Sequence, residues 1–166
     1  KMILSEGGRN LNYGIITFYR EQVNEINKAL ADSSIQIMVK DEEGHYVINT
    51  EYKKNNRDVN DIVKVGTVDA FQGMEFDVVY LSMVRSNDTE IDVSDNSPEV
   101  DRMLQRKYGF LMYENRLCVA MSRQKKALIC VGDSKMLQGA QAVKAVAPLV
   151  EYYKLCGEDE YGTIIQ

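Results

Sequence analysis

The chain of 166 residues is 45% hydrophobic and 27% charged, with a formal net charge of −5 at pH 7. This length and composition are typical of one soluble globular domain with a substantial core. No apolar run approaches the roughly 20 residues that cross a bilayer, and the first ten residues contain no signal-peptide core. We therefore expect a cytoplasmic domain without membrane contact. Because the sequence begins with Lys1, we also expect it to be part of a longer protein.

The spacing of cysteine and histidine disfavours two kinds of site. Cys118, Cys130 and Cys156 lie far apart without a CxxC pair, and His45 is the single histidine. A disulfide framework or a zinc site needs paired or clustered ligands. We expect no metal site, and we interpret the cysteines as small apolar residues in a reducing compartment and His45 as an exposed strand residue.

The first half of the chain begins with a strand and a helix. Residues 13–18 (YGIITF) are apolar and β-branched, which predicts a short buried strand. Residues 19–32 carry apolar side chains three and four positions apart, which predicts an amphipathic helix. Residues 35–52 alternate on either side of DEEG, as in a β-hairpin insertion. Residues 53–61 are polar, and we expect a loop there.

The second half continues the alternation of strands and helices. Residues 63–68 (VKVGTV) and 76–84 (FDVVYLSMV) are predicted strands, joined by the short connection DAFQGME. The sequence predicts a helix over residues 113–124. Residues 127–132 (ALICVG) are continuously apolar, which predicts a strand buried on both faces of a parallel sheet. Residues 136–155 again have a helical pattern.

The two prolines of the chain are expected to interrupt regular structure. We expect residues 88–107 to form a loop or a short helix with Pro98 as a break, and the last helix to be interrupted at Pro148. The alternating pattern as a whole predicts one α/β domain over residues 1–166, with a mostly parallel sheet flanked by helices.

Charge is distributed unevenly along the chain. Residues 88–101 carry six acids and no base, which predicts an acidic loop, whereas residues 102–126 carry seven bases and one acid. The local field around the second segment is therefore positive, and the overall negative charge does not exclude an anionic ligand.

Polar side chains at the ends of predicted strands are candidates for a ligand site. Ligands of parallel α/β sheets collect at the carboxyl ends of the strands. Arg20 and Glu75 lie in such connections, and Arg123 ends a predicted helix, where a cation can also simply cap the helix. Guanidinium groups bind phosphate oxygens and a carboxylate accepts from ribose hydroxyls, so this set suits a nucleotide.

A loop for gripping the phosphates of a nucleotide is missing from the sequence. Neither GxxxxGK followed by Ser or Thr nor GxGxxG occurs at any glycine. If the chain acts on a triphosphate, another domain must supply that loop. This absence also disfavours a small nucleotide-binding regulator.

Three segments together resemble one known family. The stretches GIITFYREQ, VGTVDAFQGMEFDVVYLSMVRSN and GFLMYENRLCVAMSRQKKALICVGD resemble motifs IV, V and VI of superfamily 1 helicases, in the branch of the nonsense-mediated-decay helicase and senataxin. The resemblance covers about residues 10–140. It implies the second RecA-like domain of such a motor, with the P-loop and the Mg²⁺-binding acids on an N-terminal RecA-like domain that this sequence lacks.

The resemblance implies roles at an ATP cleft. Arg123 matches the arginine finger and Arg20 a basic residue of motif IV that approaches the phosphates. Glu75 matches an acid that reaches the ribose, and Gly73 allows close backbone approach. The remaining expected nucleotide contacts are Tyr19 near the base, Gln72 and Arg116.

The resemblance also implies contacts with a single strand of nucleic acid. Asp69, together with Gln72, is expected to couple the ATP cleft to the strand. The expected contacts with the sugar-phosphate backbone are Thr67, Val68, Ser86 and Asn87. The chain is thus expected to be half of a monomeric ATP-driven motor, inactive alone, that moves along DNA or RNA, 5′ to 3′ by analogy with the branch.

The sequence departs from the family pattern in several places. Phe18 replaces a proline, Cys118 an asparagine and Lys125 a second arginine of motif VI. The stretch between VRSN and GFL is longer than usual. These departures leave open a degenerate binding or interaction module without motor activity.

Simpler structural roles also stay open for four of the singled-out residues. Asp69 could cap a helix that begins at Ala70. Tyr19 could be a core aromatic residue, and Arg85 and Arg116 could be partners in structural ion pairs.

Overall fold

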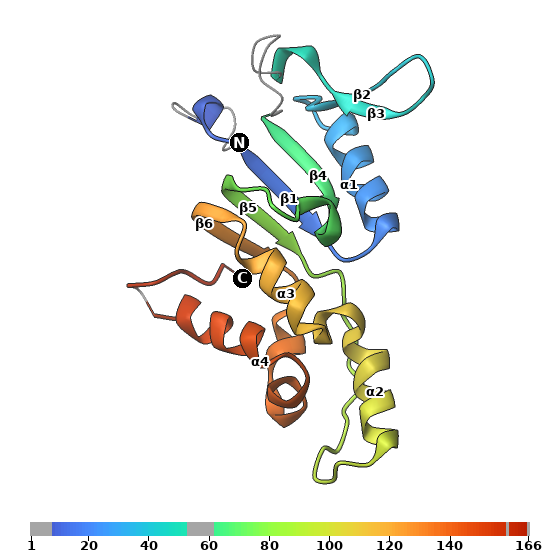
Figure 1. The fold of residues 1–166 in the computed structure, drawn as a ribbon, viewed down its shortest axis with the longest axis vertical. Helices are drawn as coiled ribbons and strands as arrows, with labels where there is room; N and C mark the ends of the chain where they lie inside the picture. Colours follow the sequence, from blue (N-terminus) through green and yellow to red (C-terminus); the bar gives the residue numbers. More distant parts are fainter. Residues whose placement is uncertain (1–7, 53–61, 159, 166) are drawn as a thin grey trace. The chain divides into compact units, whose positions relative to one another are not determined.

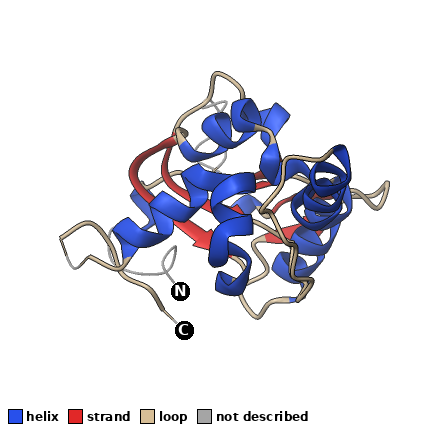
Figure 2. Ribbon diagram, turned by 90° about the horizontal axis from the view of Figure 1, so that it is seen from below, coloured by secondary structure: helices blue, strands red, loops and turns tan. Residues whose placement is uncertain are grey.

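The computed structural model describes residues 8–52, 62–158 and 160–165, which form two compact units. We call the described residues of Lys1–Val84 and Val119–Val131 the sheet unit, and those of Arg85–Cys118 and Gly132–Gln166 the helical unit. Every strand of the described chain belongs to the sheet unit, whereas the helical unit consists of helices and loops (Figures 1 and 2).

The sheet unit contains a four-stranded, fully parallel sheet in the order β4-β1-β5-β6. The strands are β1 (Tyr13–Thr17), β4 (Val63–Thr67), β5 (Phe76–Ser82) and β6 (Gln124–Val131). Helix α1 (Arg20–Asp32) follows β1. This confirms the prediction of a mostly parallel α/β fold of the RecA-like kind.

The middle of the sheet is held together by aromatic packing against glycines. Phe71 is fully buried, and its ring contacts that of Phe76 at 5.2 Å between centroids. A Cβ atom added at Gly14 would lie 3.0–3.1 Å from these two rings, and one added at Gly66 would lie 3.1 Å from Phe71. The two glycines therefore let the rings lie directly on the strands.

The predicted hairpin is present, with shorter strands than the pattern suggested. Strand β2 (Met38–Lys40) pairs antiparallel with β3 (Tyr46–Ile48), and a short 3-10 helix, Thr50–Tyr52, follows. The His45 side chain is 74% exposed, as predicted, but His45 lies in the turn just before β3 and not in a strand. The loop predicted for residues 53–61 lies outside the described residues.

Strand β6 differs from its prediction. Within the described residues it pairs with β5 alone, at the edge of the sheet, and its side chains are at most partly buried. Val131 is 57% exposed. The prediction that residues 127–132 are buried on both faces of the sheet is therefore wrong, because a strand at the edge of a sheet is left partly uncovered.

The helical unit begins its main helix at a proline. Helix α2 (Pro98–Tyr108) starts with Pro98 at its first position, and the Ser97 hydroxyl accepts a hydrogen bond from the Val100 amide at 3.4 Å. Pro98 therefore initiates a helix and does not break one, because a first-turn residue needs no amide hydrogen. A 3-10 turn, Gly109–Met112, and α3 (Glu114–Met121) follow, and α3 ends in the sheet unit.

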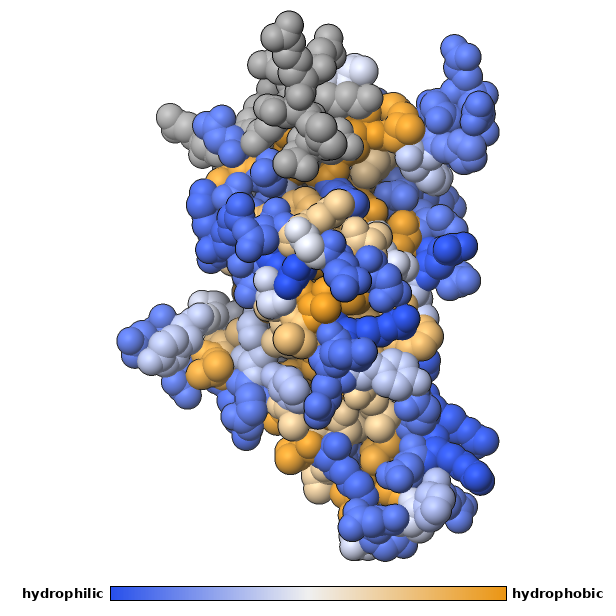
Figure 3. Space-filling model, in the orientation of Figure 1, coloured by the Kyte–Doolittle hydropathy of each residue, from blue (hydrophilic) through white to orange (hydrophobic). Residues whose placement is uncertain are grey.

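The last helix is interrupted as predicted. A 3-10 turn, Ser134–Leu137, precedes α4 (Gly139–Cys156), which leaves helical geometry at Val146 (φ −142°, ψ 43°), two residues before Pro148. No helix in the described part of the chain is both long and apolar enough to span a bilayer. On the face shown in Figure 3, hydrophilic residues interrupt the apolar surface.

Candidate nucleotide and nucleic-acid sites

The register of the sheet sorts the predicted site residues by edge. Thr17 pairs with both Thr67 and Ser82, so β1, β4 and β5 end level with one another at the carboxyl edge. Phe76 pairs with Gln124, so β5 and β6 begin together at the opposite, amino edge. Six residue steps along β5 separate the two edges by roughly 20 Å.

Tyr19 and Arg20 lie beyond the carboxyl edge. Tyr19 occupies the N-cap position of α1 with extended backbone, and Arg20 is the first, exposed residue of the helix. Tyr19 is only half-buried, so it is not a core aromatic residue. Thr67 and Val68 leave β4 at the same edge, and the Val68 side chain is buried, which limits any ligand contact there to its backbone.

Glu75 and Arg123 immediately precede β5 and β6 at the amino edge. The Arg123 guanidinium donates from Nη1 to the Met74 carbonyl at 3.3 Å, and the Arg123 carbonyl accepts from the Phe76 amide at 2.8 Å. The structure thus brings the candidate finger of RLCVAMSR to the FQGME turn. It separates both from Tyr19 and Arg20, which sequence reasoning had placed around one nucleotide.

The guanidinium of Arg123 makes two further hydrogen bonds. Nε donates to the Val119 carbonyl at 3.0 Å and Nη2 to the Ser122 hydroxyl at 2.8 Å. The bond to Val119 satisfies a carbonyl of the last helical turn, so the helix-capping interpretation is confirmed. The contacts also fix the direction of the side chain.

The connection between β4 and β5 runs from one edge of the sheet to the other. A 3-10 turn, Val68–Phe71, anchors it through the two buried residues at its ends, and Gly73 has φ +77°. Thr67 holds the N-cap position, so Asp69 lies inside the turn and the proposed capping role for Asp69 is wrong. Gln72 through Glu75 are exposed.

Ion pairs neutralise the cations that follow Arg123. Lys125 lies 3.4 Å from Glu75, and Lys126 lies 3.1 Å from Asp77. The Asp77 carboxylate accepts from the Asn12 amide at 2.9 Å, and this bond, followed by the effects of Lys126, lowers the pKa of Asp77 below its usual range. Lys125 is thus still a cation at the position where the family pattern has its second arginine, and its charge is paired with Glu75.

In the helical unit, the expected strand contacts Ser86 and Asn87 both have protein partners. The Ser86 hydroxyl donates to Asp133 at 2.6 Å, and this bond is the main cause of the lowered pKa of that carboxyl. Asn87 accepts from the Thr89 amide at 3.2 Å and donates to the Lys107 carbonyl at 3.5 Å. The two side chains thus order the segment that follows β5.

Arg85 and Arg116 also belong to the helical unit. Arg116 is half-buried, with its guanidinium carbon 4.9 Å from the centre of the Phe110 ring. Arg85 donates from Nη1 to the Arg106 carbonyl at 3.2 Å. Both contacts hold chain segments of this unit together.

Sequence reasoning missed a basic group in this unit and misjudged one cysteine. Lys107 is only 5% exposed and shares the buried stripe of α2 with Val100, Leu104 and Tyr108. The available signal was a lysine at the i, i+4, i+7 spacing of that stripe. Cys118, interpreted as a small apolar residue, is exposed; all three cysteines are free thiols, and no metal-binding cluster occurs among the described residues.

The parallel α/β fold is that of a superfamily 1 helicase-family domain, and comparison with known proteins agrees. The chain belongs to the family described as "AAA domain", whose model matches residues 1–135. It is 41% identical over 75 residues (45% of the chain) to mouse (Mus musculus) NFX1-type zinc finger-containing protein 1. It is 40% identical over 76 residues (46%) to the DNA polymerase alpha-associated DNA helicase A of Saccharomyces cerevisiae, and 33% identical over 126 residues (75%) to the mouse RNA helicase Mov10l1. The matched parts span 3%, 9% and 8% of those three proteins.

Proposed function

We propose that this chain is the second RecA-like domain of an ATP-dependent helicase and supplies its arginine finger. The observation that carries the proposal is the direct bond between Arg123 and the Met74 carbonyl, which joins the candidate finger to the turn containing Gly73 and Glu75. ATP with Mg²⁺ would be held mainly by an N-terminal RecA-like domain with a P-loop, and that domain would supply the magnesium ligands. The intact protein would act as a cytoplasmic monomer.

The residues of the amino edge can serve a nucleotide in distinct ways. Arg123 would stabilise the negative charge that develops on the γ-phosphate, and its bond to the Val119 carbonyl pre-orients it. Glu75 is exposed and could accept from ribose hydroxyls once the ribose competes with Lys125. Gly73 offers its backbone to close approach, and Gln72 is exposed beside it.

The residues of the carboxyl edge suit the single strand. Thr67 and the Val68 backbone lie there, and Arg20 adds an exposed cation at the same edge, where it can meet a backbone phosphate. Tyr19 offers a half-exposed ring for stacking. The geometry therefore favours a strand contact for Arg20 and Tyr19 over their expected place at the nucleotide.

The connection between β4 and β5 is the candidate coupling element. It begins beside the strand contacts at one edge, carries Asp69 and Gln72, and ends at Glu75 at the other edge. A shift at either end is transmitted along a segment that is anchored by the buried Phe71. Arg116, on the helix that leads to Arg123, supports the motif VI segment through its contact with Phe110.

The proposed polymer is a single strand of DNA or RNA. The contacts proposed above are made to phosphate and sugar, which carry no base information, so they leave both polymers as candidates. Both a DNA helicase and an RNA helicase are among the similar proteins. Movement from 5′ to 3′ follows the branch that the sequence resembles.

A second candidate function is a binding module without motor activity. The ion pair between Lys125 and Glu75 favours it, because it occupies the carboxylate that the ribose would use. The intact Arg123 contact with the Met74 carbonyl favours the motor.

The deciding experiment measures ATP hydrolysis by the full-length protein with and without single-stranded DNA and RNA. Arg123→Ala should lower the stimulated rate on the order of 10³-fold, because one arginine finger is worth that much in phosphoryl transfer. Lys126→Ala, three residues later, removes an exposed side chain that pairs with Asp77; it is the matched control and should retain most of the rate. The isolated 166-residue chain should show no turnover, and a wild-type protein without stimulated hydrolysis would favour the binding module.

A further inference from the structure

The guanidinium of Arg123 rests on a tight turn of the β4–β5 connection. Phe71 and Met74 close this turn, in which the Met74 amide donates to the Phe71 carbonyl at 3.0 Å. Gln72 (φ −60°, ψ 127°) and Gly73 (φ +77°) have the dihedral angles of a type II β-turn. The Met74 carbonyl then accepts from Arg123 at 3.3 Å, so the direction of the guanidinium depends in part on how firmly the turn is held.

Lys64 contacts both ends of this turn. It lies on β4 in register with Gly14 and two residues before Gly66, so its side chain leaves the sheet on the face where Phe71 packs. Its ammonium donates to the Met74 sulfur at 3.1 Å and lies 5.6 Å from the centre of the Phe71 ring. One side chain thus joins the first and the last residue of the turn.

The two partners of the Lys64 ammonium are soft ones. A thioether is a weak acceptor, and the face of an aromatic ring attracts a cation through its quadrupole. Lys64 is half-buried, and no carboxylate of the described residues is in ion-pair contact with it, whereas Lys125 and Lys126 pair with acids. Its contacts therefore serve the turn and not an ion pair.

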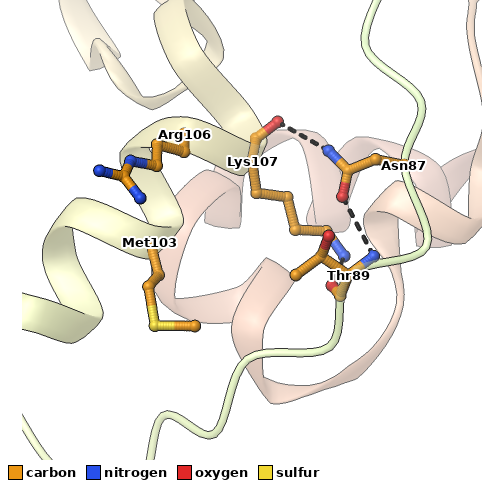
Figure 4. A pocket seen from close by; sticks show the side chains of 5 residues that line it. All are labelled: Asn87, Thr89, Met103, Arg106 and Lys107. Carbon is orange, nitrogen blue, oxygen red and sulfur yellow. Dashed lines mark hydrogen bonds between the residues drawn. The ribbon is translucent and has the colours of Figure 1, made fainter.

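Lys107, in the helical unit, is also without an acid in contact, but it has a stronger acceptor. It lines a small pocket with Asn87, Thr89, Met103 and Arg106. Figure 4 shows the Lys107 side chain extending towards Thr89, whose carbonyl accepts its hydrogen bond, and the Arg106 guanidinium directed away from it. Lys107 therefore orders its own unit, whereas the contacts of Lys64 lie on the residue that holds Arg123.

We propose that Lys64 is a positioning residue for the arginine finger: it fixes the turn so that the Met74 carbonyl holds Arg123 in the direction that phosphoryl transfer needs. The inference rests on the proposed function. Lys64 does not touch the nucleotide in this role, because its effect passes through Met74 to Arg123. A misplaced group that acts only in the transition state lowers the rate of the chemical step and leaves substrate binding unchanged.

The first test measures strand-stimulated ATP hydrolysis by the full-length protein with Lys64→Met, which keeps the length of the side chain and removes its charge. The kcat should fall roughly 2- to 10-fold, the worth of a cation–π contact with a weak hydrogen bond, and the KM for ATP should not change. Lys64→Arg keeps a cation and a donor and should restore most of the rate.

The matched control for this test is Lys40→Met. Lys40 is an exposed strand lysine of the same unit, and its ammonium also lies over a ring, 5.3 Å from the centre of Tyr46. The control variant therefore loses the same charge and the same kind of ring contact away from the turn, and it should keep the wild-type kcat.

The second test asks whether Lys64 acts through Arg123. Arg123→Ala should lower the rate on the order of 10³-fold. Adding Lys64→Met should lower the single-turnover rate no further, because the residue through which Lys64 acts is gone. Met74→Leu removes the sulfur, keeps an apolar side chain and should reproduce the loss of kcat. It remains informative if the melting temperature shows that Lys64→Met does not fold.

The outcomes are distinct. A lower kcat at unchanged KM that Lys64→Arg restores, and that disappears in the Arg123→Ala background, supports the proposal. A loss that multiplies with that of Arg123→Ala, or that appears in KM, overturns it in favour of direct contact between Lys64 and the nucleotide. Wild-type kcat in both Lys64→Met and Met74→Leu, with Arg123→Ala impaired, contradicts only this inference, whereas an unimpaired Arg123→Ala contradicts the proposed function itself.

Discussion

Two groups of cations, one in each unit, are held in opposite ways. In the sheet unit, Lys125 and Lys126 are exposed and paired with carboxylates, and Arg123 donates to backbone carbonyls. In the helical unit, Lys107 is buried with a single carbonyl acceptor, and Arg106 has no partner within the described residues. Exposed pairs cost little to form, whereas a buried charge without a counter-ion is costly. The difference teaches that the two lysines after Arg123 are balanced by acids of their own unit, whereas Arg106 and Lys107 face no carboxylate partner among the described residues.

The units also differ in how they hold their candidate residues. The sheet unit fixes two edges of one parallel sheet through strand register, so residues far apart in sequence are sorted by edge. The helical unit positions its segment after β5 through side-chain bonds from Ser86 and Asn87. A substitution in the core of the sheet should therefore disturb the positions of the candidate residues at the two edges far more than a substitution at the surface of the sheet unit.

The edge assignment is tested by pairing Arg20→Ala with Arg123→Ala. Arg123→Ala should lower turnover roughly 10³-fold. Arg20→Ala should instead mainly weaken strand binding, since Arg20 and Arg123 lie at opposite edges of the sheet. Steady-state ATPase at saturating strand and strand affinity by fluorescence anisotropy separate the two effects. An equally large loss of turnover in both variants at saturating strand would contradict the assignment.

The next largest effect is expected in the core of the sheet unit. Phe71→Ala removes a fully buried ring that packs against Gly14 and Gly66, and it should lower the free energy of unfolding by about 3–5 kcal/mol. Urea denaturation followed by circular dichroism measures this loss. Met74→Ala, in the same connection but exposed, should cost within about 0.5 kcal/mol. Similar losses from both variants would show that Phe71 does not anchor the connection.

A smaller effect separates backbone strain from function. Gly73 (φ +77°) and Gly44 (φ +83°) have no atom within 4 Å of an added Cβ, so alanine at either position suffers only the unfavourable backbone conformation, about 1 kcal/mol. Thermal unfolding should therefore show equal losses. Only Gly73→Ala should also weaken nucleotide binding by the full-length protein, measured by titration of a fluorescent ATP analogue, and an equal effect of Gly44→Ala would remove Gly73 from the site.

The smallest expected effect depends on pH. The folded pKa of Asp77 is lowered by the Asn12 amide and by Lys126, so its stabilising effect is complete above the unfolded pKa of about 3.9 and is lost as the pH falls through the folded value. Asp77→Asn should cost below about 1 kcal/mol at pH 7, because the group is partly screened by solvent. The difference from wild type, measured by urea denaturation, should shrink below about pH 4. A difference that stays constant to pH 2 would contradict this role.

Much of the fold and of the amino-edge site followed from local patterns. The apolar run of 13–18 and the spacing in 19–32 predicted β1 and α1, because a strand and an amphipathic helix each leave a periodic trace in the sequence. Arg123 and Glu75 were singled out because they stand in the short motifs RLCVAMSR and FQGME, which can be recognised from the order of residues alone. Edge exposure of β6 was missed, because an apolar run does not reveal how many strands flank it.

The sequence by itself determined most of the strands and helices and singled out the candidate nucleotide residues, since these depend on side-chain chemistry and short-range periodicity. Only the tertiary structure decided that Arg20 and Arg123 lie at opposite edges, because strand register is set by pairing between distant segments. It also decided that Lys107 is buried beside Asn87 and Thr89 without an acid, since burial depends on which segments pack together.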